Sequence, residues 1–284
     1  MATSKNPKPC VTRTNCFILR RNREISYYSC RAFESLPWLH HGFSTRWDGG
    51  GEIISDSATL NTSDSLNEKC RRMFSALGHK NAEIVSLNQI HSNRVFVVET
   101  ARYSEIENYK GDGLVTNIEN VALAIKTADC FPILIVDPIR KAICAVHSGW
   151  RGTLSRILPG AIDEMVRRYQ SDPARLMVAL GPGIRECCFE VGEEVARMFK
   201  EAYPGESTAR TRPDVPGKYL VNLAGVLKTQ LTQAGIPPEN QHDSGMCTCC
   251  NTREFFSLRA EGAAAGRMIS VIALEETLIN PDIS

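Results

Sequence analysis

The chain has 284 residues, 43% of them hydrophobic and 23% charged, which is an ordinary composition for a globular protein with a sizeable core. With 33 basic and 32 acidic residues the formal net charge is +1. The overall charge therefore does not indicate a nucleic acid or a membrane as partner, and apolar runs such as ILIV and VIAL are far too short to span a bilayer.

The N-terminus is basic, because six Lys or Arg residues precede the first acidic residue, Glu24. It contains no apolar segment or cleavage site typical of secretion, so we interpret residues 1–35 as a basic N-terminal tail or extension, with a targeting signal as the alternative. Residues 36–284 are expected to form a single domain. The 11 cysteines are odd in number and scattered, which favours reduced thiols and a cytoplasmic location.

Short segments rich in Val and Ile, separated by turn residues, predict strands. They cover residues 82–87, 94–100, 113–116, 121–126, 131–136, 142–147, 175–180, 218–223 and 267–275. Helical periodicity covers 153–170, 192–202 and 223–234, and the Pro- and Gly-containing segment 203–217 is expected to be a surface loop. Because strands come in succession and helices follow mainly after residue 150, the pattern predicts an α+β domain.

The segment HSGWRGT, residues 147–153, leads from the end of a predicted strand into a predicted helix. Backbone N–H groups at a helix start, together with Arg151 and Gly152, make a candidate anion-binding site. The alternative is that its glycines only permit a tight turn.

Three residues of types that bind zinc stand at strand ends or turns: His91, Cys130 and His147. Zinc prefers imidazole and thiolate, and three protein ligands leave one position for water or a substrate. The residues are far apart in the sequence, so their spacing leaves a core, a catalytic pair and a metal site all open.

Several polar residues near these segments are further candidates. Asp112 is either a turn residue or a proton carrier, and Asp129 adjoins Cys130, where it can reach a ligand or a bound water. Arg46 precedes a glycine-rich loop and is either an anion-binding or a surface arginine.

The run CTCC at residues 247–250 contains one CxxC pattern. No second CxxC and no paired histidines accompany it, so a structural zinc site is not expected there. The pair Cys187 and Cys188 is interpreted as core or incidental.

Taken in order, the motifs NQIH, GDGLVT, TADCFPILI, AVHSGWRGT, GPGI, FEVGEEV, FFSLR and GR resemble those of the laccase-domain family. The resemblance extends from about residue 41 to 275. Members of this family, labelled multicopper polyphenol oxidases, act as zinc-dependent purine nucleoside phosphorylases. The resemblance implies phosphorolysis of adenosine, inosine, guanosine and S-methyl-5'-thioadenosine, with adenosine deaminase activity, on small-molecule substrates.

The resemblance also implies a fold and a set of site residues. The fold is a single multilayer α+β domain with mixed β-sheets, similar to bacterial deamidase-toxin-like cysteine hydrolases. One zinc per chain would be held by His91, Cys130 and His147. Substrate or phosphate binding falls to Arg46, Gln89, Arg151 and Gly152, and catalytic roles to Arg46, Asp112, Asp129 and Cys130. Copper is not expected, because the repeated HxH motifs of true laccases are absent.

The chain departs from the family pattern at four positions, Ser92, Ser148, Leu258 and Ala260, so no role is predicted for the neighbouring Arg259. Two other functions remain open. One is a Cys/His hydrolase or amidase that edits peptidoglycan precursors, with Cys130 as nucleophile and His147 as base. The other is a non-enzymatic module in which zinc only stabilises the fold. The sequence does not indicate an oligomeric state.

Overall fold

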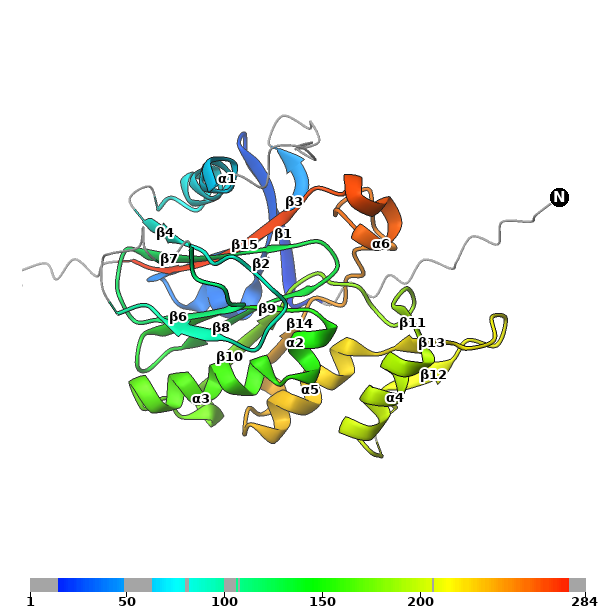
Figure 1. Ribbon diagram of the computed structural model, residues 1–284. Coiled ribbons are helices and arrows are strands. Elements are labelled where there is room, and N and C mark those ends of the chain that lie inside the picture. The colour runs from blue at the N-terminus through cyan, green and yellow to red at the C-terminus, as the bar shows by residue number, and fades with distance from the viewer. Residues whose placement is uncertain are drawn as a thin grey trace, which may run out of the picture.

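The computed structural model describes residues 15–48, 63–79, 82–99, 106, 108–205 and 207–275. Two six-stranded sheets stack face to face, and helices cover the outer face of each (Figure 1). The layers are therefore α1, the first sheet, the second sheet, and a layer containing α2, α3 and α5.

The first sheet has the order β1-β2-β3-β15-β7-β4. Its strands are β1 (Phe17–Arg21), β2 (Ile25–Cys30), β3 (Leu39–Asp48), β15 (Met268–Leu274), β7 (Val121–Thr127) and β4 (Glu83–Val85). All neighbours are antiparallel except β4 and β7. Helix α1 (Ser63–Ala76) packs Cys70, Met73 and Phe74 against the outer face.

The second sheet has the order β14-β10-β8-β9-β6-β5. Its strands are β14 (Gln241–Asp243), β10 (Met177–Leu180), β8 (Phe131–Asp137), β9 (Ala142–Ser148), β6 (Gly113–Thr116) and β5 (Val95–Val97). The pairs β10–β14 and β5–β6 are parallel and the others antiparallel. Every residue of β8 and β9 is buried, because these strands have the first sheet on one face and helices on the other. This explains their continuous apolar runs.

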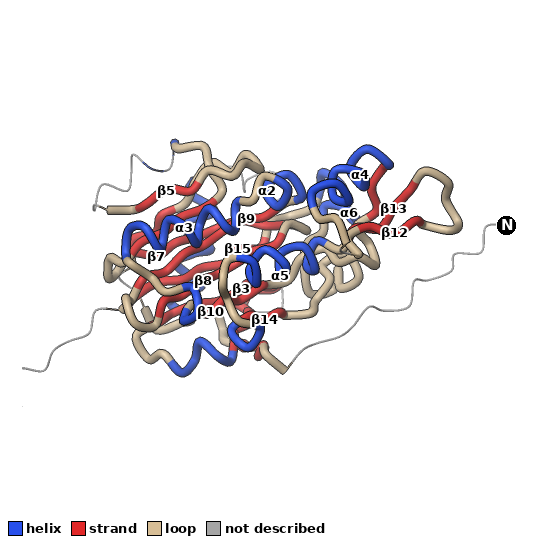
Figure 2. The backbone as a smooth tube through the Cα atoms, turned by 90° about the horizontal axis from the view of Figure 1, so that it is seen from below, coloured by secondary structure: helices blue, strands red, loops and turns tan. Residues whose placement is uncertain are grey.

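The helices of the outer layer are α2 (Trp150–Leu154), α3 (Ile157–Tyr169) and α5 (Leu223–Gln233). Figure 2 shows α3 and α5 lying across the second sheet. The helix predicted over 153–170 is interrupted, because Arg156 adopts a left-handed conformation with φ of 59° between α2 and α3. The Asn222 side chain caps α5 by accepting a hydrogen bond from the Gly225 amide.

A third, three-stranded sheet extends from one end of the molecule (Figure 2). It has the order β11 (Glu190–Gly192), β13 (Lys218–Val221) and β12 (Ala209–Thr211), and α4 (Glu193–Ala202) packs on it. The loop predicted over 203–217 therefore contains a strand. Other elements of the described residues include α6 (Leu258–Glu261) and the short 3-10 helices Arg31–Ser35, Pro173–Arg175, Pro238–Asn240 and Gly262–Ala264.

The N-terminal region differs from the prediction. Residues 15–35, assigned from sequence to a basic tail, contain β1 and β2, which form one edge of the first sheet. All six residues of β2, ISYYSC, are buried. The burial of this segment places it in the sheet despite the basic residues that precede it. Residues 1–14 lie outside the described residues.

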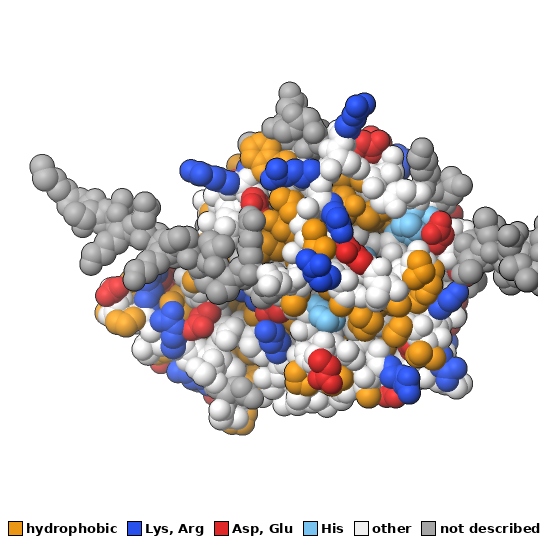
Figure 3. All heavy atoms as spheres, turned by 180° about the vertical axis from the view of Figure 1, so that it is seen from behind, with side chains coloured by type: hydrophobic (Ala, Val, Ile, Leu, Met, Phe, Trp, Pro, Cys, Tyr) orange, Lys and Arg blue, Asp and Glu red, His pale blue; other side chains and the backbone are white. Residues whose placement is uncertain are grey.

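The α+β architecture with mixed sheets is confirmed, whereas the likeness to cysteine hydrolases stays a prediction. Figure 3 shows basic and acidic side chains interspersed over one face, in keeping with the balanced charge. Among the described residues, no helix has the length and apolar character needed to cross a bilayer.

Candidate active site

His91, Cys130 and His147 come together in space. Their metal-binding atoms all lie within 4.8 Å of one another. Strands β8 and β9 pair antiparallel with Pro132 opposite His147, so Cys130, just before β8, lies beside the end of β9. The rings of His91 and His147 meet edge to face, with centroids 4.9 Å apart. We call these three residues the triad.

Asp112 holds two members of the triad from behind. The carboxylate is fully buried and accepts hydrogen bonds from His147 Nδ1 at 2.8 Å and from the His91 amide at 3.0 Å. The amide and hydroxyl of Ser92 donate to it at 2.6 and 2.7 Å. Burial raises the pKa of Asp112, but the hydrogen bonds from His147 and Ser92 outweigh it, so the pKa is lowered. The bond to Nδ1 leaves Nε2 as the metal-binding atom of His147.

Two members of the triad, Cys130 and His147, favour their charged forms. Burial raises the pKa of Cys130, yet hydrogen bonds with His147 and His91 outweigh it and lower the pKa to about 6. Burial lowers the pKa of His147, whereas its hydrogen bonds to Asp112 and Cys130 raise it to about 9. A thiolate is the form that binds metals or attacks an electrophile.

Gly149 leaves room for the triad. A Cβ atom at this position would lie 2.9 Å from Cys130 Sγ and 2.9 Å from His91 Cδ2. Both distances are shorter than ordinary van der Waals contacts, so a side chain here would displace two of the three residues.

A cavity of about 320 Å³ opens beside His91 and Cys130. Its other lining residues combine apolar, basic and acidic side chains: Ala128, Asp129, Gly149, Trp150, Arg151, Ile184, Phe189, Leu223, Leu258 and Arg259. Pockets of roughly 300–1,000 Å³ with apolar walls and few polar groups are typical of small-molecule sites. The cavity is thus large enough for a small ligand in contact with the triad.

Asp129 is held rigidly at the wall of this cavity. Its backbone is left-handed, with φ of 80°, which is unfavourable for a residue other than glycine. Its carboxylate accepts hydrogen bonds from the Thr248 hydroxyl at 2.6 Å and the Arg259 amide at 2.7 Å, and its carbonyl accepts one from the Ile184 amide at 2.7 Å. Three separate segments therefore maintain the strained conformation.

The arginines differ in position. The Arg151 guanidinium lies 4.2 Å from the centre of the Trp150 ring and lines the cavity. Arg259, for which the sequence predicted no role, also lines it, and its guanidinium donates to the carbonyls of Cys188 and Glu190 at 3.0 and 2.9 Å. The signal that could have found Arg259 is the FFSLR motif.

Three predicted binding residues do not line the cavity. Arg46 forms an ion pair with Glu261 at 2.9 Å and donates to the Thr252 carbonyl. Gln89 bonds through both ends of its amide to the backbone of Lys126, at 2.8 and 2.7 Å. Gly152 is buried, where an added Cβ would lie 3.2 Å from the Ser92 carbonyl oxygen. These positions indicate structural contacts for all three.

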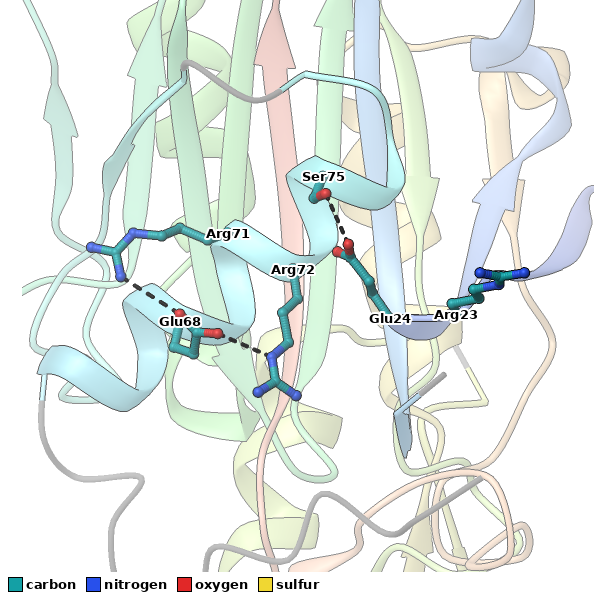
Figure 4. Close-up of a pocket in the computed structure, with 6 residues that line it drawn as sticks. All are labelled: Arg23, Glu24, Glu68, Arg71, Arg72 and Ser75. Carbon is teal, nitrogen blue, oxygen red and sulfur yellow. Dashed lines mark hydrogen bonds and ion pairs between the residues drawn. The ribbon is translucent and has the colours of Figure 1, made fainter. Parts of the chain in front are cut away.

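A second hollow, of about 410 Å³, lies between α1 and the turn that joins β1 to β2 (Figure 4). Several of its polar groups already bond to one another, since Glu68 pairs with Arg72 at 3.1 Å and the Ser75 hydroxyl donates to Glu24 at 3.1 Å. It brings together no set of reactive groups comparable to the triad.

The triad fits a zinc ion by its donor chemistry. One thiolate and two imidazoles are ligands that zinc prefers, and three protein ligands leave a position open to a substrate. Asp112 supplies the carboxylate partner that metal-binding histidines usually have.

Comparisons with known proteins agree with the motifs. The model of the family described as multi-copper polyphenol oxidoreductase laccase matches residues 40–275. A purine nucleoside phosphorylase of Deinococcus radiodurans is 35% identical over 82% of this chain and 88% of its own length. An adenosine deaminase, RL5, from an unknown prokaryotic organism is 33% identical over 75% of this chain and 86% of its own.

Two further relatives extend the comparison. Purine nucleoside phosphorylase LACC1 of the mouse is 32% identical over 83% of this chain, which spans only 56% of the mouse protein. The crystal structure of YlmD from Geobacillus stearothermophilus superposes with a TM-score of 0.79 at 26% identity, covering 92% of this chain and 100% of that one. The matched region includes the triad and the cavity, and the chain belongs to the laccase-domain family.

Proposed function

We propose that this protein is a zinc-dependent purine nucleoside phosphorylase that also deaminates adenosine. The proposed substrates are adenosine, inosine, guanosine and S-methyl-5'-thioadenosine. The names of the relatives support this reaction class. The observation that carries the proposal is a cluster of three metal-binding side chains, two of which, His91 and Cys130, line a cavity that is also lined by two arginines.

His91, Cys130 and His147 would hold the zinc, which supplies Lewis acidity toward a substrate oxygen when bound. Asp112 fixes the orientation of His147 through Nδ1 and the backbone of the His91 turn. Because Asp112 does not line the cavity, we assign it positioning and not the proton transfer expected from sequence.

Arg151 and Arg259 are assigned to phosphate. Both line the cavity, and guanidinium groups bind phosphate oxygens in a bidentate manner. Arg259 uses two of its donors on the carbonyls of Cys188 and Glu190, so it is held in place with donors to spare. This assignment replaces Arg46, whose charge is paired with Glu261.

The apolar wall is assigned to the purine base and Asp129 to its protonation. Phe189, Leu258 and Ile184 border the cavity and offer the flat apolar contacts that a base needs. The Asp129 carboxylate is the acidic group that lines the cavity, and its two bonded donors fix its position. A proton carried by Asp129 would serve the leaving amine or the purine nitrogen.

The test is phosphorolysis of inosine and adenosine by the purified protein, with zinc content measured on the same sample. We expect free base and ribose 1-phosphate only when phosphate is present. Arg151→Ala and Arg259→Ala should raise KM for phosphate more than KM for nucleoside, whereas Arg140→Ala, an exposed arginine in the β8–β9 turn, should change neither. Zinc-loaded protein without turnover of any proposed nucleoside would contradict the proposal.

One observation favours a second candidate, a thiol hydrolase or amidase acting on peptidoglycan precursors. Cys130, His147 and Asp112 form a hydrogen-bonded series in the order of nucleophile, base and orienting acid. A zinc-bound sulfur is a poor nucleophile, so the two functions separate experimentally. The hydrolase would be favoured if iodoacetamide alkylated Cys130 and abolished amidase activity at a rate that added zinc did not slow.

A further inference from the structure

A second group of metal-binding side chains lies away from the triad. The sulfur atoms of Cys187, Cys188, Cys247 and Cys250 all lie within 4.8 Å of one another. The Cys188–Cys250 and Cys187–Cys250 sulfurs are 3.3 and 3.5 Å apart. We call these four residues the tetracysteine group. Cys247 is fully buried and the others are half-buried.

Two adjacent parallel strands bring these cysteines together. Strands β10 and β14 pair in parallel, and the chain segments that leave them stay side by side. Gly183 bridges to Cys247, with hydrogen bonds from the Gly183 amide to the Met246 carbonyl at 3.3 Å and from the Thr248 amide to the Gly183 carbonyl at 3.2 Å. One turn then presents Cys187 and Cys188, and the other presents Cys247 and Cys250.

The sulfur separations fit one tetrahedral ion. A Zn–S distance of about 2.3 Å places tetrahedral sulfurs about 3.8 Å apart, within the range observed here. No described cysteine is in a disulfide, and 3.3 Å is far longer than an S–S bond of about 2.05 Å. An iron–sulfur cluster would spread the four sulfurs further than a single ion does. The Arg185 amide also donates to Cys247 Sγ at 3.4 Å, a contact suited to a thiolate.

We propose that Cys187, Cys188, Cys247 and Cys250 bind a second zinc ion in a closed four-thiolate site. Such a set has no open position, so its role is structural. The protein then holds two zinc ions per chain, one more than the resemblance implies. The proposal does not depend on phosphorylase activity.

The site would connect directly to the walls of the triad cavity. Thr248, between two of the ligands, donates its hydroxyl to Asp129 at 2.6 Å. The Cys188 carbonyl accepts a hydrogen bond from Arg259 at 3.0 Å. Ile184 and Phe189, which line the cavity, flank Cys187 and Cys188 in the chain. Crosslinking the two turns through a metal would therefore fix Asp129 and Arg259.

Metal content of the full-length protein tests the proposal. We expect two zinc ions per chain in the wild type and one in Cys247→Ser and in Cys250→Ser. Cys249→Ser, in the same CTCC run but outside the tetracysteine group, is the matched control and should keep two. Cys130→Ala should keep one, so loss of the triad and loss of the tetracysteine group give separate signals.

A second measurement tests the proposal even if the Cys247→Ser and Cys250→Ser variants fail to fold. Cobalt added to metal-free Cys130→Ala protein should give the intense sulfur-to-metal absorption of a four-thiolate site, and the melting temperature should rise by several degrees. The proposal would be overturned if the wild type bound only one zinc ion per chain and Cys247→Ser kept that ion. So would iron in place of zinc, or the loss of two titratable thiols to a disulfide.

Discussion

The triad and the tetracysteine group are both candidate metal centres, but they differ in donors and surroundings. The triad offers one sulfur and two imidazoles at the edge of a cavity, and Asp112 supports it from behind. The tetracysteine group offers four sulfurs between two turns. A three-ligand set leaves room for a substrate, whereas a four-ligand set does not. We therefore assign chemistry to the first centre and support of the fold to the second, as proposed above.

Removing a triad ligand should have the largest effect, because it should abolish zinc binding at one centre and leave the other unchanged. Cys130→Ala should lose the triad zinc and reduce phosphorolysis by more than the ~10–100-fold typical of an outer partner. The tetracysteine zinc and the circular dichroism spectrum should not change. Cys144→Ala, a buried cysteine of β9, is the control and should keep both metals. Full turnover by zinc-depleted Cys130→Ala would remove the triad from the mechanism.

Removing the support behind the triad should have the next largest effect. Asp112→Asn keeps the size of the side chain but loses the negative charge beside His147 Nδ1. We expect triad zinc affinity to fall roughly 10–100-fold, measured by competition with a chelator. Affinity at the tetracysteine group should stay the same. Equal chelator resistance of variant and wild type at the triad would show that Asp112 does not position a ligand.

Filling the space beside the triad should have a smaller effect. The backbone of Gly149, with φ of −82° and ψ of 176°, suits alanine, so Gly149→Ala acts only through its Cβ contacts with Cys130 and His91. We expect a severalfold loss of triad zinc affinity by the same competition. Gly160→Ala, whose Cβ would meet no atom within 4 Å, is the control. Unchanged affinity in Gly149→Ala would show that the ligands can shift without cost.

The smallest effect on the metal centres is expected at the anchor of the tetracysteine turn, where a substitution acts on the stability of the fold. Arg185 pairs with Asp243 at 2.5 Å, and both side chains are 11% exposed. Burial raises the pKa of Asp243, but Arg185 outweighs it and lowers the pKa to about 2. A lowered folded-state pKa stabilises the protein above the unfolded value of about 3.9, and this is lost as pH falls toward 2.

Asp243→Asn should therefore lower the free energy of unfolding by about 2 kcal/mol at pH 7. Denaturant unfolding of both proteins between pH 7 and pH 3 measures the difference, which should narrow below pH 4. A difference that stays constant over this range would mean that the ion pair does not provide the stability.

The sequence predicted local features better than long-range ones. The strands at 113–116, 121–126 and 131–136 were found because apolar β-branched runs are a local signal. β1 and β2 were missed because they join the sheet through the pairing of β2 with β3, while their flanking charges resemble those of a tail. The triad, suggested by motifs and the resemblance, is assembled by the β8–β9 pairing and the His91 turn.

Two groups of side chains have contacts that the sequence does not reveal, for a common physical reason. Arg46 carries the charge that binds anions, yet its partner Glu261 lies over 200 residues away in the sequence. Cys187 and Cys188 were interpreted as core or incidental residues, and they do pack against the core. The cysteines that lie beside them follow β14, and only the parallel β10–β14 pairing reveals this proximity. Residue type determines which interactions a side chain can make, and the tertiary fold determines which of them it makes.

The three triad residues also differ in how firmly the chain holds them. His147 lies in a fully buried strand, and its amide donates to the Asp112 carbonyl at 2.8 Å. His91 is exposed and sits on a turn with a left-handed φ of 60°. Local opening of that turn costs far less than opening the sheet. A bound metal would therefore leave by release of His91 first, and the opening rate of this one turn would set the rate of metal exchange.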